Sequence, residues 1–395
     1  MEKIWNTTFI ILSPIIFSLR IIIYLKNSIF KKRRKIINES LKNQLSKNWK
    51  DKGGYVAGQG HYQNVWTRDS FFALMAPIPE KEYRLRTFTD RLKNDIKNGQ
   101  IPFTYNEVYY IPKILFNKTI KRDKPIPKYK DEKYNSLVMD SNSQYIIMVH
   151  EAFKINNNKA WLRTHLATIK KAINWYNNYL ENDLIKEKPF GSWEDTLLLN
   201  GNIAYTNILY LEALKRTHLI FITLKMKHYN YIYDNLYNEK YEKVINLIDK
   251  ERDVVSVSLA ALWIENEKIN IWINYILNKK DNFMIKNRNP IKKNNDTMLA
   301  VRIIGQGNYH REWRWSWVGC LFCYILLKRN LINNSLNLFK FYKDAFNEYG
   351  TIYEVYNKKT KKPVEISLYK SEGMFSEGIG LYLLVEKLLV DFLML

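Results

Sequence analysis

Residues 142–154 read N-S-Q-Y-I-I-M-V-H-E-A-F-K, and this stretch determines the fold class that the sequence predicts. Its apolar residues Tyr145, Ile146, Val149 and Phe153 recur at three- and four-residue spacing, so they share one face of a helix. Similar spacing recurs over residues 36–48, 68–77, 83–98, 159–180, 202–216, 238–250, 256–278, 315–329, 331–347 and 375–393. We therefore predict an all-helical protein.

Composition and the number of helical segments narrow the fold further. The chain has 395 residues with only 14 Gly and 10 Pro, whereas an all-β fold needs many turn residues. About a dozen helices over roughly 350 residues, separated by loops that carry tryptophans and acids, favour a double ring of helices, the (α/α)6 toroid. Other helical arrays satisfy the same count. Two long loops, at residues 99–135 and 348–374, are typical places for functional residues.

The N-terminal segment differs from the rest of the chain. Residues 8–25 are almost all apolar and basic residues follow them, which is typical of a membrane helix, although Pro14 and Arg20 weaken the pattern. No A-x-A cleavage site follows, so we expect an uncleaved anchor. We therefore expect residues 1–35 to form an N-terminal hydrophobic helix and a basic stretch, and residues 36–395 to form one helical domain. Without a working anchor, we expect the protein in the cytoplasm.

The net charge of +23 has two interpretations. One is a nucleic-acid or anionic-membrane partner. The other is compositional bias, because Lys, Asn, Ile and Tyr are abundant together and the lysines are spread evenly. The one dense basic run, at residues 31–35, lies outside the candidate core. We favour bias and expect no nucleic-acid partner.

Cys320 and Cys323 have the C-x-x-C spacing that redox and zinc sites use. They lie in the apolar run WVGCLFCYILL, and the sequence offers no second pair of zinc ligands. We therefore interpret both as core thiols and expect neither a metal nor a cofactor.

Four segments carry residue types that bind or hydrolyse sugars. The first is V-W-T-R-D-S at residues 65–70. Asp69 can accept hydrogen bonds from sugar hydroxyls, Arg68 can donate them, and Trp66 can stack on the apolar face of a pyranose ring. The alternative is an aspartate that caps a helix beside a buried tryptophan.

The second and third segments each offer a carboxyl group. In G-S-W-E-D at residues 191–195, the carboxyl beside Trp193 is partly desolvated and has a charged neighbour. Both effects favour the protonated form that a general acid needs, although a solvated helix start gives the same pattern. In I-Y-E-V-Y-N at residues 352–357, Glu354 is a candidate base that activates water, with a surface glutamate as the alternative.

The fourth segment is Y-H-R-E-W-R-W-S-W at residues 309–317. Its tryptophans, Trp313, Trp315 and Trp317, are too large to be left exposed in a loop. They either pack in the core or form the floor of a pocket, and we expect a mixture of the two.

These segments, in this order, resemble glucoamylases and related members of glycoside hydrolase family 15. V-W-T-R-D-S at 65–70 is similar to the segment whose arginine and aspartate hold the sugar, and D-S-N-S-Q-Y-I-I-M at 140–148 to one that begins a barrel helix. S-W-E-D at 192–195 and Y-E-V-Y-N-K-K-T at 353–360 resemble the segments that supply the general acid and the base. The resemblance covers roughly residues 50–390.

The resemblance implies an (α/α)6 catalytic domain that hydrolyses α-glucosidic bonds of oligosaccharides or α-glucans with inversion, without metal or cofactor. It implies Glu194 as the acid and Glu354 as the base. The implied sugar-binding residues are Trp66, Arg68, Asp69, Trp193, Asp195 and Trp315. We expect a monomer with an α-glucoside as its partner and with membrane association through residues 8–25.

Departures from the family pattern leave alternatives open. The family often has Glu where Asp195 stands, and tryptophan-serine is common where Ser376 and Glu377 stand. Glu372 and Glu377 are therefore rival candidates for the base. A glycan-binding or regulatory toroid without catalysis is a second hypothesis for the function, and a debranching-type or trehalase-type α-glucosidase is a third.

Overall fold

The structure is a computed structural model, and it describes residues 36–60, 62–108, 120–131, 135–279, 297, 302, 306–366 and 369–393. The expected N-terminal helix and basic stretch lie outside these residues, so the anchor stays a prediction. Among the helices that are described, none has both the length and the hydrophobicity that spanning a bilayer requires.

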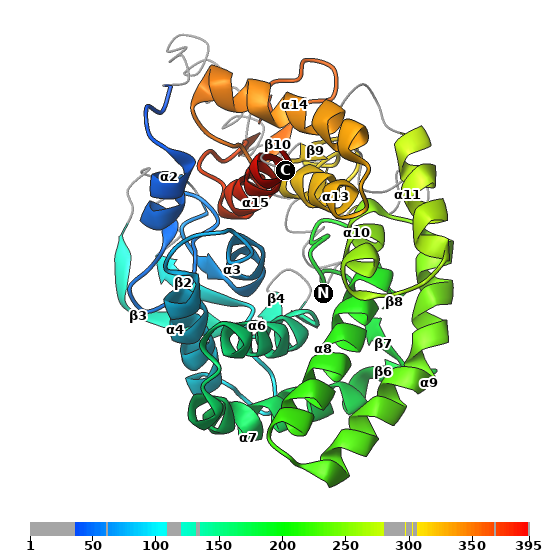
Figure 1. Cartoon of the computed structure of the whole chain (residues 1–395). Coiled ribbons are helices and arrows are strands. Elements are labelled where there is room, and N and C mark those ends of the chain that lie inside the picture. The colour runs from blue at the N-terminus through cyan, green and yellow to red at the C-terminus, as the bar shows by residue number, and fades with distance from the viewer. Residues whose placement is uncertain are drawn as a thin grey trace.

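Six helices form an inner ring, which Figure 1 shows around the centre of the molecule. Each inner helix contacts the next one along the chain, and the last one returns to the first. They are α3 (Thr67–Ala73), α6 (Ser141–Asn156), α8 (Ala204–Thr223), α10 (Val254–Trp263), α13 (Ser316–Lys328) and α15 (Ser376–Leu393). The contact between α15 and α3 closes the ring.

Six further helices pack outside this ring and alternate with the inner helices along the chain. They are α2 (Leu41–Asn48), α4 (Lys81–Asn94), α7 (Lys159–Trp175), α9 (Lys227–Glu251), α11 (Lys268–Asn278) and α14 (Ile332–Tyr349). Over the described ranges the chain therefore forms six outer–inner helix pairs. This arrangement confirms the predicted (α/α)6 toroid.

The two rings differ in how much of each helix is buried. In α13, every residue except Tyr324 and Lys328 is buried, and the buried residues include Cys320 and Cys323, as expected for core thiols. In α7, by contrast, the buried residues form one stripe along a helix whose other side faces solvent. A helix that is apolar all round belongs inside a fold, whereas an amphipathic helix covers its surface.

The prediction of one helix at residues 256–278 is wrong, because the structure has two helices there, α10 and α11. The backbone turns to an extended conformation at Ile264. The side chain of Asn266 then accepts a hydrogen bond from the backbone N–H of Lys268 at 2.9 Å, at the start of α11. Asparagine competes for backbone N–H groups in this way, and no Gly or Pro marks the break in the sequence.

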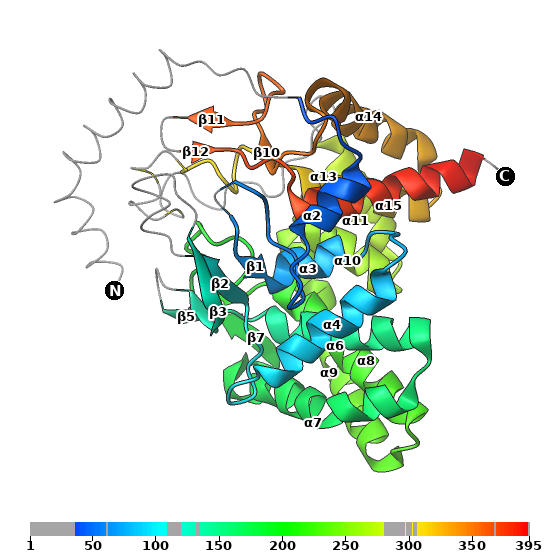
Figure 2. The same cartoon turned by 90° about the vertical axis from the view of Figure 1, so that its left-hand side faces the viewer.

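The strands are short and antiparallel, and several lie in the two segments predicted as long loops. Figure 2 shows them gathered at one end of the helices. They are β1 (Val65–Trp66), β2 (Thr104–Val108) and β3 (Lys121–Lys128); β4 (Lys130–Asp131) and β5 (Ser136–Leu137); β6 (Leu180–Glu181), β7 (Leu184–Glu187) and β8 (Gly201–Asn202); β9 (Arg314–Trp315) and β10 (Val355–Tyr356); β11 (Glu365–Ile366) and β12 (Tyr369–Lys370). These small sheets fix the segments that enter the inner helices.

Candidate active site

A cavity of about 290 Å³ lies where the chain enters the inner helices α3, α8, α13 and α15. Segments far apart in the sequence meet there. Its walls are formed by Ala57, Tyr62, Trp66, Arg68, Asp69, Trp193, Asp195, Thr196, Gln306, Tyr309, Trp315, Trp317, Glu354, Phe375 and Glu377. Seven of the eight residues that the sequence singled out therefore line one cavity, and Glu194 is the exception.

The start of α3 presents the first group of polar side chains. Strand β1 pairs with β2 directly before this helix, and Trp66 occupies the N-cap position without a side-chain hydrogen bond. Arg68 and Asp69 follow in the first helical turn, where both side chains reach the cavity. Asp69 does not cap the helix, so the alternative interpretation of this segment is wrong.

Asp140 holds Arg68 in place. Its Oδ2 accepts a hydrogen bond from Arg68 Nε at 2.7 Å and another from the hydroxyl of Tyr205 at 3.0 Å. The carboxyl of Asp140 is buried, and it occupies the N-cap position of α6. Such a buried, doubly bonded carboxylate fixes the guanidinium geometry. Sequence reasoning quoted Asp140 as the start of a helix but gave it no role in the site.

The segment before α8 places Trp193, Glu194 and Asp195 differently. Trp193 and Asp195 line the cavity, whereas Glu194 is 2% exposed and is not among the lining residues. One third of the Asp195 side chain is exposed, and its Oδ1 lies 3.2 Å from Nε2 of His310. A backbone bond from Met139 N to Gly191 O at 2.9 Å ties this segment to the start of α6.

Glu354 reaches the cavity from the opposite segment. Its backbone is fixed on both sides, because its N–H donates to Glu372 O at 2.8 Å and its carbonyl accepts from Ser316 N at 2.9 Å. The hydroxyl of Tyr369 donates to Oε2 at 2.5 Å, and the hydroxyl of Tyr309 donates to Oε1. Glu354 is 2% exposed, so its interpretation as a surface glutamate is wrong.

The two tyrosines at Glu354 stay neutral donors. Burial and the nearby charge of Glu354 raise the pKa of Tyr309 and of Tyr369 well above the ordinary value. Hydrogen bonds to a carboxylate stabilise its charged form, so this pair of donors favours an ionised Glu354. Sequence reasoning missed the roles of both tyrosines: Tyr309 opened the quoted Trp-rich segment, and no pattern marked Tyr369.

The two rival bases occupy different places. Glu377 lines the cavity, and burial together with Asp69 raises its pKa well above the ordinary value. Glu372 does not line the cavity: it packs against Gly58 and Gly60, and its Oε1 accepts a hydrogen bond from the backbone N–H of Gly60. A Cβ at position 58 would lie 2.2 Å from Cγ of Glu372, so this close approach requires glycine.

The Trp-rich segment is the mixture that the sequence predicted. Trp315 and Trp317 line the cavity, and the ring of Trp193 meets both edge-on at 5.7 and 4.9 Å between centroids. His310 stacks on Trp315 at 5.0 Å with an interplanar angle of 5°. Trp313 instead packs behind the wall. Aromatic edges and faces of this kind form a rigid floor.

The charges in the cavity are unbalanced. Four carboxyl groups line it with one guanidinium, that of Arg68. Burial, with the charge of Glu354 nearby, raises the pKa of Asp69 to about 7 although Arg68 opposes the shift. Among the described residues, no group of three or more His, Cys, Asp or Glu side chains has the arrangement of a metal site. The cavity therefore brings carboxyl, guanidinium and aromatic side chains together, and groups of these types can bind hydroxyls and exchange protons.

Comparisons with known proteins bear on the fold. No protein-family model matches this sequence, and neither does any curated protein. Among solved structures, a mannosylglycerate hydrolase of glycoside hydrolase family 63 from Thermus thermophilus, in complex with glucose, is similar. It has 11% sequence identity and a TM-score of 0.62, over 87% of this chain and 98% of that chain.

Two further solved structures are similar to this chain in fold. The same Thermus hydrolase in complex with Tris and D-glycerate has 11% identity and a TM-score of 0.63, over 87% of this chain and 98% of that chain. A glycosidase variant in complex with glucose has 10% identity and a TM-score of 0.61, over 89% of this chain and 96% of that chain. At such low identity the similarity establishes a shared fold, and that fold is the helical toroid of these glycosidases.

Proposed function

We propose that this protein is a glycoside hydrolase that cleaves α-glucosidic bonds with inversion at the sugar carbon. One observation carries the proposal: Glu354 and the Trp193–Asp195 segment, which are far apart in the sequence, border the same small cavity as Arg68 and Asp69. Glycosidases with the same fold, including structures in complex with glucose, support it. The resemblance of the sequence segments to glucoamylases supports the choice of an α-glucoside.

Glu194 is the general acid in this proposal. Glu194 is almost fully buried, and its two neighbours in the sequence, Trp193 and Asp195, line the cavity. It protonates the glycosidic oxygen as the bond breaks. Asp195 is more exposed and lies beside His310, so it suits binding of a sugar hydroxyl.

Glu354 is the base. Two tyrosine hydroxyls hold its carboxylate, and their hydrogen bonds favour the ionised form that accepts a proton from water. The water attacks the sugar carbon from the face opposite the departing oxygen. Inversion needs room for that water, so the two carboxyl groups act across a gap of roughly 6.5–9.5 Å in such enzymes.

Arg68 and Asp69 fix the sugar that is released. The bond from Arg68 to Asp140 uses Nε, and the Arg68 side chain lines the cavity. Guanidinium and carboxylate together bind neighbouring hydroxyls of one ring. The aromatic floor of Trp193, Trp315 and Trp317 offers the apolar contact that the ring carbons need.

The experiment that tests the function uses the purified full chain and a panel of maltose, isomaltose, trehalose and dextran. We expect glucose release from at least one member. Glu194→Gln should lower kcat by at least about a thousandfold while the sugar still binds, because only the proton donor is lost. Asp195→Asn is the matched comparison, and it should raise KM more than it lowers kcat.

The outcomes separate the alternatives. Full activity in Glu194→Gln together with an inactive Asp195→Asn would move the acid role to Asp195. Saturable binding of these sugars without any turnover would support the glycan-binding toroid instead of a hydrolase. No binding and no turnover with the whole panel would overturn the proposal.

A further inference from the structure

A second hollow, of about 580 Å³, lies apart from the candidate active site and shares no lining residue with it. The turn after α4, the strands β4 and β5 and the end of α7 form its walls. Ligand pockets in proteins commonly have volumes of roughly 300–1,000 Å³, so this hollow is large enough for a small molecule or a short chain. The active-site proposal gives it no role.

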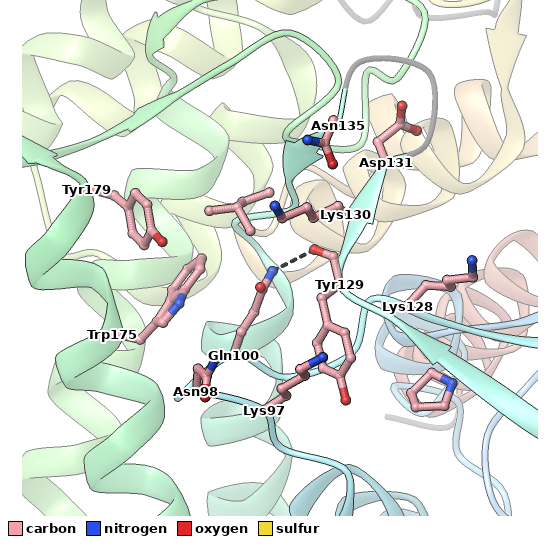
Figure 3. A pocket seen from close by; sticks show the side chains of 12 residues that line it. Lys97, Asn98, Gln100, Lys128, Tyr129, Lys130, Asp131, Asn135, Trp175 and Tyr179 are labelled. Atoms are coloured by element: carbon pink, nitrogen blue, oxygen red, sulfur yellow. Dashed lines mark hydrogen bonds between the residues drawn. The ribbon is translucent and has the colours of Figure 1, made fainter.

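One wall of the hollow is aromatic. The rings of Trp175 and Tyr179 are 4.5 Å apart between centroids, with an interplanar angle of 47°. Figure 3 shows both rings on the same side of the hollow, across from Tyr129 and Lys97. Trp175 is 7% exposed, so the half-buried ring of Tyr179 offers the face against which the apolar side of a pyranose ring packs.

The floor carries amide groups. Gln100 is buried, and its Nε2 donates to the backbone carbonyl of Tyr129 at 2.7 Å, which fixes the side chain between the two walls (Figure 3). Asn98 and Asn135 are exposed at the rim. The exposed amides of Asn98 and Asn135 can both donate and accept hydrogen bonds, so they match the hydroxyl groups of a sugar.

The hollow is positively charged, in contrast to the active-site cavity. Lys97, Lys128 and Lys130 line it, and Asp131, which is 9% exposed, is the single carboxylate among the lining residues. The active-site cavity instead has four carboxyl groups and one guanidinium. An anionic sugar is therefore attracted to the hollow.

We propose that this hollow is an auxiliary binding site for an anionic saccharide, a short chain of uronic acids. In this proposal the aromatic wall packs against a sugar ring, the amides form hydrogen bonds with its hydroxyl groups, and the lysines pair with its carboxylates. The site is separate from the proposed hydrolytic cavity, and the proposal stands whether or not the protein hydrolyses α-glucosides.

Isothermal titration of the full chain with trigalacturonate at 0.15 M salt tests this site. We expect saturable binding of one trigalacturonate per chain. The double variant Lys97→Gln/Lys130→Gln should weaken binding about tenfold or more, because it removes two charge-assisted contacts. Tyr179→Ala should weaken it by at least about fivefold through loss of the ring contact.

Matched controls separate this site from general attraction to a basic protein. Lys340→Gln/Lys343→Gln removes the same charge from exposed lysines of α14 and should change the affinity less than about twofold. Glu194→Gln/Glu354→Gln should bind trigalacturonate as the wild type does. The proposal is overturned by an absence of binding, by equal weakening in the α14 control, by wild-type affinity in Tyr179→Ala, or by a change in affinity in the active-site variant. Displacement of trigalacturonate by single-stranded DNA with a higher affinity would assign the hollow to nucleic acid instead.

Discussion

Among single residues, Glu354 depends most on partners that are distant in the chain. Its two hydroxyl donors come from the segment before α13 and from β12, and the backbone of Glu372 fixes its position. The sequence marked Glu354 within the segment I-Y-E-V-Y-N, whereas its hydroxyl donors Tyr309 and Tyr369 lie in other segments. Hydrogen bonds of this kind form only when the ring of inner helices closes, and no local sequence pattern predicts them.

Tyr369→Phe removes one of the two donors to Glu354. Losing a hydrogen bond to a carboxylate disfavours its charged form, so kcat/KM should fall about tenfold and the acid limb of the pH–rate profile should move to higher pH. Initial rates between pH 4 and 8 measure both effects. Tyr382→Phe, which changes a buried tyrosine of α15 that does not line the cavity, is the control and should leave the profile in place. An unchanged acid limb in Tyr369→Phe would remove Glu354 from the base role.

Asp69 should make the protein less stable as the pH rises. Burial raises the pKa of Asp69 from 3.8 to about 7, so the folded protein binds this proton more tightly than the unfolded chain does. The stability that the neutral acid contributes is complete below about pH 4 and is lost as the pH rises to about 7. Asp69→Asn mimics the neutral acid and escapes this loss.

Urea denaturation of both proteins between pH 4 and 8 measures the effect. The free energy of unfolding of Asp69→Asn minus that of the wild type should increase over this range, by about 4 kcal/mol at most. Titrating groups that do not interact with Asp69 cancel in this difference, whereas the pKa of Glu377, which Asp69 raises, changes with the substitution. A difference that stays constant with pH would show that Asp69 is an ordinary ionised carboxylate.

Among the elements, the inner helix α13 and the outer helix α14 pack so closely that little space separates the inner and outer helices. A Cβ at Gly319 would lie 1.7 Å from the hydroxyl oxygen of Tyr342, and Tyr342 is itself buried. Glycine in the middle of a helix costs stability, so its presence here has a packing reason. The sequence pattern predicted α13 and α14 correctly as helices but gave no sign of this contact.

Gly319→Ala should therefore lower the free energy of unfolding by about 1–3 kcal/mol, because a packed core resists an added methyl group. The midpoint of urea unfolding, with its slope, measures this change. Gly307→Ala is the control: its Cβ would meet the flexible side chain of Arg302 at 3.2 Å, and stability should change by less than about 0.5 kcal/mol. Equal stability in Gly319→Ala and the wild type would contradict the packing described.

The sequence predicted most inner and outer helices because each buries a face with regular spacing. It predicted one helix where α10 and α11 stand, because the side chain of Asn266 breaks the helix without Gly or Pro. It also predicted loops where β2, β3, β10 and β12 lie. Strands β10 and β12 have two residues each, too few to alternate, and β3 contains Pro125 and Pro127, which are typical of loops. The sequence predicted the site residues that are clustered in short segments, as at 65–70 and 191–195. It did not predict the single tyrosines Tyr309 and Tyr369, which donate hydrogen bonds to Glu354.

In the molecule as a whole, the outer helix α2 joins the start of the described chain to α15, the helix that closes the inner ring on α3. Helix α2 packs on α15, and Asn48 at its end donates to Ser376 Oγ at 2.8 Å and to the carbonyl of Met374 at 2.5 Å. Gln44 in the same helix donates to the carbonyl of Gly350 at 2.6 Å. These bonds position the segment that carries Phe375 and Glu377 into the cavity.

Asn48→Ala should weaken both the packing of α2 on α15 and catalysis. It leaves buried polar groups without a partner, so the free energy of unfolding should fall by about 1–3 kcal/mol. Any glucosidase activity should fall with it, because Phe375 and Glu377 lose their anchor. Asn43→Ala, on the exposed side of the same helix, is the control and should change neither quantity measurably. Loss of stability with full retention of activity would show that the closure does not support the site.

The central claim is that Glu194 and Glu354 act from opposite sides of one sugar ring. Proton NMR of the glucose first released from the best α-glucoside, recorded faster than the anomers interconvert, tests it directly. We expect β-glucose to appear first, and we expect neither Glu194→Gln nor Glu354→Gln to release it at a comparable rate. Initial release of α-glucose, or undiminished release by either variant, would show that the two carboxyl groups do not act in this way.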